Sequence, residues 1–157
     1  MQVVIWGDPV TKEPVSFEVN IIQSSELESA KNQLEQLIKN GAKVTAAGGD
    51  GAFDEIDFWN WLEWKNLYSL IKPDKNARED TESVLRNLAV KWRNENGYDK
   101  WREKTGYGDR WPSTEGVFSA VKRMFGEQIH ARSEIGILQE ASVKFWAYKT
   151  LKQYGEA

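Results

Sequence analysis

Residues 44–51, Val-Thr-Ala-Ala-Gly-Gly-Asp-Gly, decide the fold prediction. Their small and β-branched residues predict a short buried strand, and the glycines around Asp50 predict the point where that strand ends. A hairpin pattern and a helical pattern precede this strand in the sequence. A strand, a helix and a further strand in succession predict a βαβ crossover, so at least part of the sheet should be parallel and the fold class α/β.

The preceding sequence predicts a β-hairpin and one helix. Apolar residues alternate on both sides of a Gly-Asp-Pro turn between Val3 and Val19, as expected for two paired strands. Ser25 and Glu28 form a capping box in front of a leucine-rich helical pattern. An Asn-Gly pair at residue 40 predicts the end of this helix.

The sequence that follows Asp50 predicts a helix and a strand. Asp54 is expected to cap a tryptophan-rich helix over residues 55–65. A strand is expected over residues 68–71, because Pro73 closes a short apolar run there.

The rest of the chain predicts helices only. Residues 74–110 have weak periodicity and many polar residues, so we interpret them as an inserted or mobile segment with one helix at about 81–93. Two amphipathic patterns, at about 112–126 and 134–154, predict the last helices.

Composition places the chain among globular proteins. Its 157 residues fit one domain, 40% of them are hydrophobic and 29% are charged. The sequence lacks both a secretory signal and an apolar run of the about 18 residues that a transmembrane helix needs, so we expect a cytoplasmic protein with no membrane partner. The absence of cysteine excludes disulfide scaffolds, and the one histidine, His130, excludes a multi-histidine metal site.

The net charge of −3 conceals an uneven distribution of charge along the chain. Residues 1–71 hold 5 basic residues against 11 acidic ones, whereas residues 91–132 hold 9 against 6. This asymmetry is compatible with a carboxylate site beside an anion-binding surface, although a solvated face gives the same pattern.

Two acids have positions that suit a functional carboxylate. Asp50 follows a predicted buried strand, and ligands of open α/β sheets bind beyond the carboxyl ends of strands. The alternative is a turn residue that caps the next helical segment. Glu115 lies in the first turn of the helix after Pro112, where it also complements the helix dipole. At about 100° per residue, Lys122 lies within about 40° of Glu115 and Arg123 near about 80°, away from the apolar stripe, as on any solvated helix face.

Three cations directly follow the strand predicted over residues 68–71, namely Lys72, Lys75 and Arg78. Cations at such a position can bind phosphate groups, which makes them candidate nucleic-acid contacts. The eight tryptophans can stack on bases, but packing explains their helical positions as well.

Four runs of residues occur in the order found in DDE-type transposases of prokaryotic insertion sequences. They are DGAFD (50–54), IKPDKNAR (71–78), GYGDRW (106–111) and TEGVFSAVKRMFGE (114–127). The chain resembles this family over roughly residues 3–154, and the last run is the most specific. The resemblance implies a ribonuclease H-like mixed sheet with flanking helices.

The resemblance also implies a chemistry and roles for particular residues. In this family three carboxylates bind two divalent metal ions, Mg²⁺ or Mn²⁺, and drive DNA strand cleavage and transfer. Asp50 resembles the second of these acids and Glu115 the third, so both are expected to be catalytic metal ligands. Lys122 and Arg123 resemble the basic residues that follow the third acid. With the other cations they form the expected set of phosphate contacts at the transposon ends: Lys72, Lys75, Arg78, Arg110, Lys122 and Arg123.

One departure from the family pattern concerns the first acid. In the family it lies on a strand before the hairpin, whereas this sequence begins at the hairpin, and Asp8 resembles a turn residue. Residues 1–157 therefore resemble a truncated domain whose first strand is missing and which is inactive alone. Because the missing strand leaves unpaired edges, we expect the hairpin to close onto the Asp50 strand, or a homodimer or a full-length transposase to fill the gap.

Two other interpretations remain open from the sequence. The chain can be a non-enzymatic fragment that binds DNA or pairs with full-length transposase to regulate it. It can also be an unrelated metal-dependent nuclease whose third carboxylate is Asp54, Asp57 or Glu127.

Overall fold

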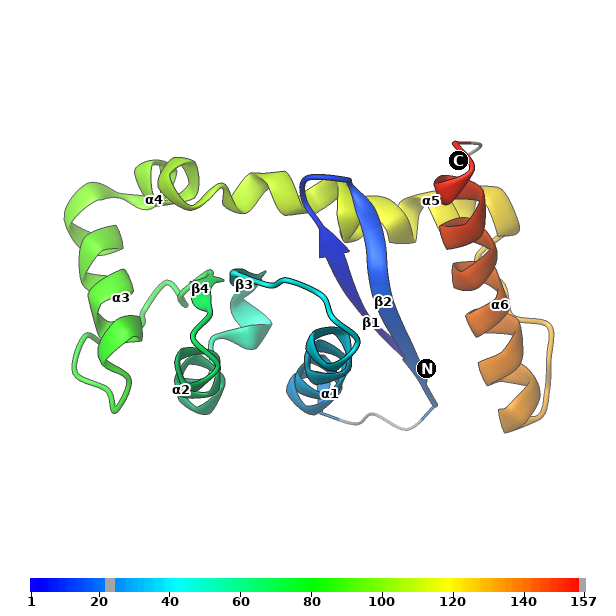
Figure 1. Ribbon diagram of the computed structural model, residues 1–157, viewed down its shortest axis with the longest axis horizontal. Helices are drawn as coiled ribbons and strands as arrows, with labels where there is room; N and C mark the ends of the chain where they lie inside the picture. Colours follow the sequence, from blue (N-terminus) through cyan, green and yellow to red (C-terminus); the bar gives the residue numbers. More distant parts are fainter. Residues whose placement is uncertain (22–24, 156–157) are drawn as a thin grey trace. The chain divides into compact units, whose positions relative to one another are not determined.

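The computed structural model of the protein describes residues 1–21 and 25–155. The chain divides into two compact units, which we call the hairpin unit (Met1–Gly41 with Arg110–Ala157) and the parallel-strand unit (Ala42–Asp109). Within the described ranges the strands form two sheets of two strands each, where the sequence predicted one mixed sheet. The α/β class is confirmed (Figure 1).

The hairpin unit begins with the predicted antiparallel hairpin. Strand β1 (Gln2–Asp8) pairs with β2 (Glu13–Asn20), and the register shifts by a bulge between Trp6 and Gly7. The hairpin prediction is therefore confirmed.

Helix α1 (Glu26–Lys39) packs on one face of the hairpin (Figure 1). The Ser25 side chain caps its first turn, as predicted. The Trp6 indole donates to the carbonyl of Ala30 at 2.9 Å, and the Gln33 amide donates to the carbonyl of Val4 at 3.2 Å. These bonds fix the even-numbered residues of β1 toward α1.

Helices α5 (Glu115–Phe125) and α6 (Glu134–Gln153) supply the other apolar layer of this unit. Their buried residues form one cluster against which the hairpin packs Val3, Ile5 and Phe17. Both faces of β1 are thus covered, which explains why its sequence is a continuous apolar run rather than an alternating one. The cluster comprises Val117, Ala120, Val121, Phe145 and Tyr148.

The start of α5 differs slightly from the prediction. A 3₁₀ helix, η2 (Tyr107–Ser113), contains Pro112, and α5 begins only at Glu115. Because proline cannot donate a backbone hydrogen bond, it is tolerated in this tight irregular turn. The sequence left open whether Gly126 ends or bends this helix; in the structure Gly126 ends α5 with a φ of 77°.

The parallel-strand unit contains a parallel pair of strands, as the sequence predicted, but the crossover that joins them is not the predicted one. Strand β3 (Ala46–Gly49) pairs in parallel with β4 (Tyr68–Ile71), and α2 (Ile56–Trp64) connects them. The prediction had placed the crossover between the hairpin and β3. The strand also begins two residues later than predicted, at Ala46.

Two helices occupy the segment that was predicted to be inserted or mobile. Helix α3 (Val84–Asn96) starts three residues later than expected, and α4 (Tyr98–Thr105) was not predicted. Helix α3 contacts α2 and α4, so this segment is part of the same compact unit as β3 and β4 (Figure 1).

None of the helices in the part of the chain that the structure describes is both long and apolar enough to span a bilayer.

Gly7 is the position of the hairpin unit that tolerates a side chain least. A Cβ atom placed on Gly7 would lie 2.2 Å from the carbonyl oxygen of the fully buried Ser113. We expect Gly7→Ala to lower the free energy of unfolding by about 1–3 kcal/mol, because the two backbones must separate. Urea denaturation followed by circular dichroism measures this change.

Val10→Ala is the control for this variant, because Val10 lies in the hairpin turn and is 86% exposed. Its stability should stay within about 0.5 kcal/mol of the wild type. Equal stability of the Gly7 variant and the wild type would contradict the close packing of β1 on the residues before α5.

Candidate functional site

Asp50 lies at the carboxyl end of β3. Its side chain caps the short 3₁₀ helix η1 (Gly51–Phe53) by accepting a hydrogen bond from the Ala52 amide at 3.0 Å. The predicted capping role is therefore confirmed. Because the residue is exposed and this bond uses only Oδ1, the carboxylate can still accept a ligand at Oδ2.

The residues after β4 lie at the same edge of the parallel pair as Asp50. The Lys72 amide donates to the carbonyl of Gly49 at 3.0 Å, which extends the ladder by one residue. A Cβ atom on Gly51 would lie 3.2 Å from Oδ1 of Asp74, so the two loops are in contact. The carboxyl ends of parallel strands meet at one edge, and here they bring Asp50 beside the loop that carries the predicted cations.

The three cations of this loop have different environments. The Lys72 ammonium lies over the Tyr98 ring, 5.3 Å from its centre. Arg78 donates two hydrogen bonds to Asp80, at 2.9 and 2.6 Å, which raise the pKa of the guanidinium and lower the pKa of the Asp80 carboxyl. Lys75 is exposed. Lys75 can therefore bind a ligand directly, whereas Arg78 must first break its ion pair with Asp80.

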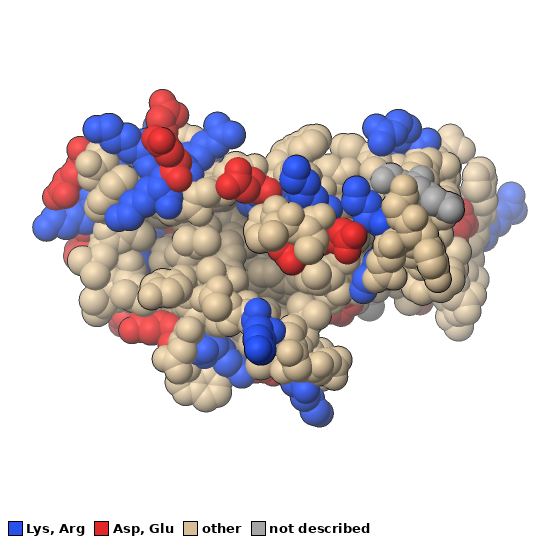
Figure 2. All heavy atoms as spheres, turned by 45° about the horizontal axis from the view of Figure 1, so that its top comes forward, with Lys and Arg blue, Asp and Glu red and all other residues tan. Residues whose placement is uncertain are grey.

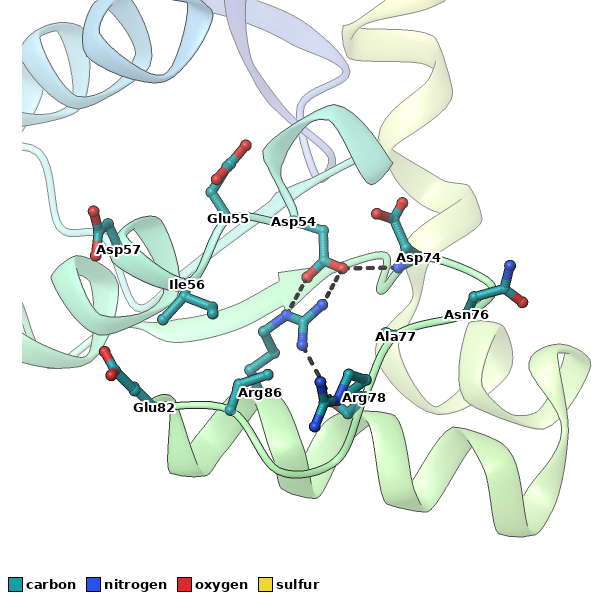
Figure 3. A pocket seen from close by; sticks show the side chains of 11 residues that line it. Asp54, Glu55, Ile56, Asp57, Asp74, Asn76, Ala77, Arg78, Glu82 and Arg86 are labelled. Atoms are coloured by element: carbon teal, nitrogen blue, oxygen red, sulfur yellow. Dashed lines mark hydrogen bonds and ion pairs between the residues drawn. The ribbon is translucent and has the colours of Figure 1, made fainter.

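An open pocket of about 560 Å³ lies between this loop, the start of α2 and the start of α3. Asp57 and Glu82 lie at one end of it and Asn76 at the other (Figure 3). The buried pair of Asp54 and Arg86 forms its base.

The Asp54 carboxylate is the most heavily hydrogen-bonded acid of the parallel-strand unit. Its Oδ1 accepts from the Trp59 indole at 2.9 Å and from Nε of Arg86 at 2.8 Å. Its Oδ2 accepts from Nη2 of Arg86 and from the Asp74 amide, both at 2.8 Å (Figure 3). The side chain is fully buried.

These contacts correct two predictions about Asp54. It does not cap α2, because Glu55 is the N-cap residue and makes no side-chain capping bond. It also does not suit the role of a third metal ligand, because four donors already occupy its two oxygens. Of the other proposed acids, Asp57 is exposed, and Glu127 is bonded to Lys122 at 2.8 Å in the hairpin unit.

Sequence reasoning missed Arg86 and Arg93, the two buried arginines of α3. They are separated by seven residues, with the fully buried Val90 between them, so all three lie on one face of the helix. An arginine at a core position of a helical pattern is the signal that could have identified them, because a buried charge needs dedicated partners.

Glu115 occupies the first turn of α5, in the hairpin unit. It accepts hydrogen bonds from Arg110 at 2.5 Å and from the Thr114 hydroxyl. Partial burial raises the pKa of the Glu115 carboxyl, but the bonds from Arg110 and Thr114 outweigh it, and the pKa is lowered. Glu115 is therefore an anion at neutral pH. Arg110 forms an ion pair with it, so this guanidinium must leave Glu115 before it can bind a phosphate.

The prediction that Lys122 and Arg123 lie away from the apolar stripe of α5 is confirmed. Ser119, Lys122 and Arg123 are exposed, while Val117 and Val121 are buried against α6. Lys122 forms an ion pair with Glu127, in which both side chains are more than half exposed.

Asp50 belongs to the parallel-strand unit and Glu115 to the hairpin unit. The prediction that their carboxylates face one another therefore stays a prediction. Across residues 1–21 and 25–155, no cluster of three or more acids, histidines or cysteines is close enough to hold a metal ion.

Charges of both signs occur on the surface of the molecule. Figure 2 shows Lys and Arg interspersed with Asp and Glu over the face that it presents. Binding of a polyanion to this face would depend on local groups of cations rather than on a broad positive field.

Comparison of the chain with protein-family models, with curated proteins and with solved structures gives no match.

The buried pair of Asp54 and Arg86 predicts a large effect of Asp54→Asn. The variant should lose about 3–5 kcal/mol of stability, because it leaves a buried guanidinium without its anion. Urea denaturation measures the change, and Asp57→Asn is the matched control, because Asp57 is an exposed acid in the first turn of α2; its stability should stay within about 0.5 kcal/mol of the wild type. A loss as small as that of the control would contradict the role of the ion pair.

The lowered pKa of Glu115 predicts a pH dependence of stability. A carboxyl whose pKa is lower in the folded state stabilises the fold above the ordinary glutamate pKa of about 4.3, and this contribution is lost as the pH falls through the lowered value. Wild type should therefore exceed Glu115→Gln in unfolding temperature at pH 7, and the difference should shrink by pH 3.

Arg110→Gln tests the cause of this effect. In the Arg110→Gln background, the effect of Glu115→Gln on the unfolding temperature should depend less on pH, because Arg110 donates one of the bonds that lower the pKa of Glu115 and the bond from Thr114 remains. A difference between wild type and Glu115→Gln that is constant from pH 7 to pH 3 would contradict the assignment.

Proposed function

We propose that this chain is the C-terminal part of a DDE-type insertion-sequence transposase, with a ribonuclease H-like catalytic domain whose first strand and first acid are not in this sequence. In this proposal Asp50 and Glu115 are catalytic carboxylates for metal-dependent DNA strand cleavage and transfer. The chain alone lacks one of the three acids and is inactive.

One observation carries the proposal more than any other. Asp50 and the loop from Lys72 to Arg78 lie together at the carboxyl edge of the β3–β4 pair. An acid that can hold a metal ion beside cations that can hold phosphates is what phosphoryl transfer on DNA requires.

Asp50 and Glu115 have the chemistry to bind a divalent cation such as Mg²⁺ or Mn²⁺. Carboxylate oxygens are the preferred ligands of these hard ions, and Asp50 has an exposed carboxylate with one oxygen outside its capping bond. Glu115 is anionic, and it must release Arg110 to bind an ion. Divalent ions held by these acids would stabilise the attacking and leaving oxygens of the phosphodiester.

Each of the two proposed acids has candidate DNA-binding cations within its own unit. Lys72, Lys75 and Arg78 come from the loop after β4, and Lys122 and Arg123 from the exposed face of α5. Such side chains bind and orient the DNA backbone without reading its sequence. Arg110 joins this set once it is released from Glu115.

A second candidate is a non-enzymatic fragment that binds DNA or pairs with another transposase chain. The sheet topology favours it, because both described sheets contain only two strands and so have unpaired edges. A two-stranded sheet is marginally stable, and its edges can accept a strand from a second copy or from a full-length transposase.

The function is tested first with the chain alone. It should bind duplex DNA with an affinity that falls steeply with salt and depends little on sequence, and it should bind Mn²⁺ weakly. It should not cleave transposon-end DNA at a useful rate. Efficient cleavage with Mg²⁺ by the chain alone would contradict the proposed missing acid.

Complementation distinguishes the two candidates. A supplied segment that carries the family's first strand and its aspartate should restore metal-dependent cleavage. Asp50→Ala or Glu115→Ala should then abolish cleavage, because the carboxylates act as a unit. The matched control is Glu63→Ala, an exposed acid of α2 that no interpretation of the site includes, which should retain activity. DNA binding without any restored cleavage would favour the regulatory fragment.

A further inference from the structure

The two buried arginines of α3, Arg86 and Arg93, both donate hydrogen bonds to backbone carbonyls of the loop after β4. Only 6% of Arg86 and 7% of Arg93 is exposed. Buried guanidinium groups are costly unless their donors are satisfied, so the groups that satisfy them are structurally tied to α3.

Arg93 holds the first half of the loop after β4 by its backbone. Its Nη1 donates to the carbonyls of Pro73 at 2.8 Å and Asp74 at 2.6 Å, and its Nη2 donates to the carbonyl of Lys75 at 3.3 Å. Nη2 also donates to the side chain of Asn94 at 3.1 Å. One planar guanidinium thus turns three successive carbonyls toward α3.

Arg86 holds the far end of the same loop. Its Nη1 donates to the carbonyl of Arg78 at 3.3 Å, while its other nitrogens bind Asp54. Asp54 in turn accepts the Asp74 amide, and the Ala77 amide donates to the carbonyl of Asp74 at 3.0 Å. The loop is therefore fixed at both ends and closed by a turn.

The middle of this loop turns its backbone toward α3 and leaves its side chains exposed. The carbonyls of residues 73–75 and 78 are turned inward, and the side chains of Lys75 and Asn76 are exposed. Asn76 projects away from the ion pair that fixes the loop (Figure 3). The geometry preorganises the loop, so little conformational entropy is lost when Lys75 binds a phosphate.

We propose that Arg86 and Arg93 are positioning residues that hold the loop from Lys72 to Arg78 in the conformation in which Lys75 contacts the DNA backbone. This inference rests on the proposed function, because it takes a DNA phosphodiester as the ligand of Lys75. Neither arginine contacts DNA itself, since both are buried under the loop.

The test measures the affinity of the full chain for a fluorescent 30-base-pair duplex of arbitrary sequence at several salt concentrations. Lys75→Ala should weaken binding about three- to tenfold and make the salt dependence less steep, as expected for one lost phosphate contact. Arg93→Lys keeps the charge but not the planar fork, so it should weaken binding by a similar factor.

The double variant separates positioning from a general structural effect. In the Lys75→Ala background, Arg93→Lys should weaken binding by a smaller factor than it does in the wild-type background, because the contact of Lys75 that it positions is already gone. Hydrogen exchange of the amides of residues 74–78 should be faster in Arg93→Lys than in wild type. Lys91→Ala, an exposed charge on the same helix, is the matched control and should bind within twofold of wild type.

Asn94→Ala provides a second variant in case Arg93→Lys does not fold. Asn94 is exposed; its side-chain oxygen accepts from Nη2 of Arg93 at 3.1 Å, and its side-chain amide donates to Glu79 at 2.8 Å. This variant should therefore fold and weaken binding about twofold or more, again only when Lys75 is present.

Two results would overturn the inference and can be told apart. The first applies if wild type binds the duplex and Lys75→Ala weakens binding. The positioning role alone would then be overturned if the folded arginine variants bind with unchanged affinity, or if the two losses multiply in the double variant. If wild type shows no salt-dependent binding, the proposed function and the positioning role fail together.

Discussion

The parallel-strand unit depends on one buried ion pair. The Asp54 carboxylate binds Arg86 of α3 through two oxygens and also accepts the Trp59 indole of α2 and the Asp74 amide after β4. These four donors come from three segments, so a single side chain joins α2, α3 and the loop between β4 and α3. Two short parallel strands cannot form a stable sheet by themselves, and this network supplies the connections that a larger sheet would otherwise make.

The hairpin unit is held together by apolar layers instead. Hairpin residues contact α1 on one face and the cluster of α5 and α6 on the other, and the tight approach of Gly7 to Ser113 joins the hairpin to the segment before α5. This packing leaves the opposite face of α5 to Glu115, Lys122 and Arg123. Burial of one stripe of a helix therefore decides which of its charges can meet a ligand.

Both units place acids beside cations, but in different ways. In the parallel-strand unit the backbone brings Asp50 and Lys72 to one sheet edge, while buried arginines shape the loop that carries Lys75. In the hairpin unit Glu115 is already bound to Arg110, so its carboxylate is charged but occupied. A ligand at the first site meets an available acid, whereas a ligand at the second must displace a cation.

The sequence by itself determined the elements with strong local signals. The hairpin and helices α1 and α6 follow from alternation, caps and helical periodicity, and Asp50 follows from glycines at the end of a strand, because all of these depend on neighbours in the chain. Only the tertiary structure decided the roles of Asp54, Arg86 and Arg93. Asp54 looked like a helix cap and the arginines like polar residues of a mobile segment, since nothing local shows that residues 32 positions apart form a buried pair. Burial turned these ordinary charges into the connections of the unit, and burial is a property of the packed chain.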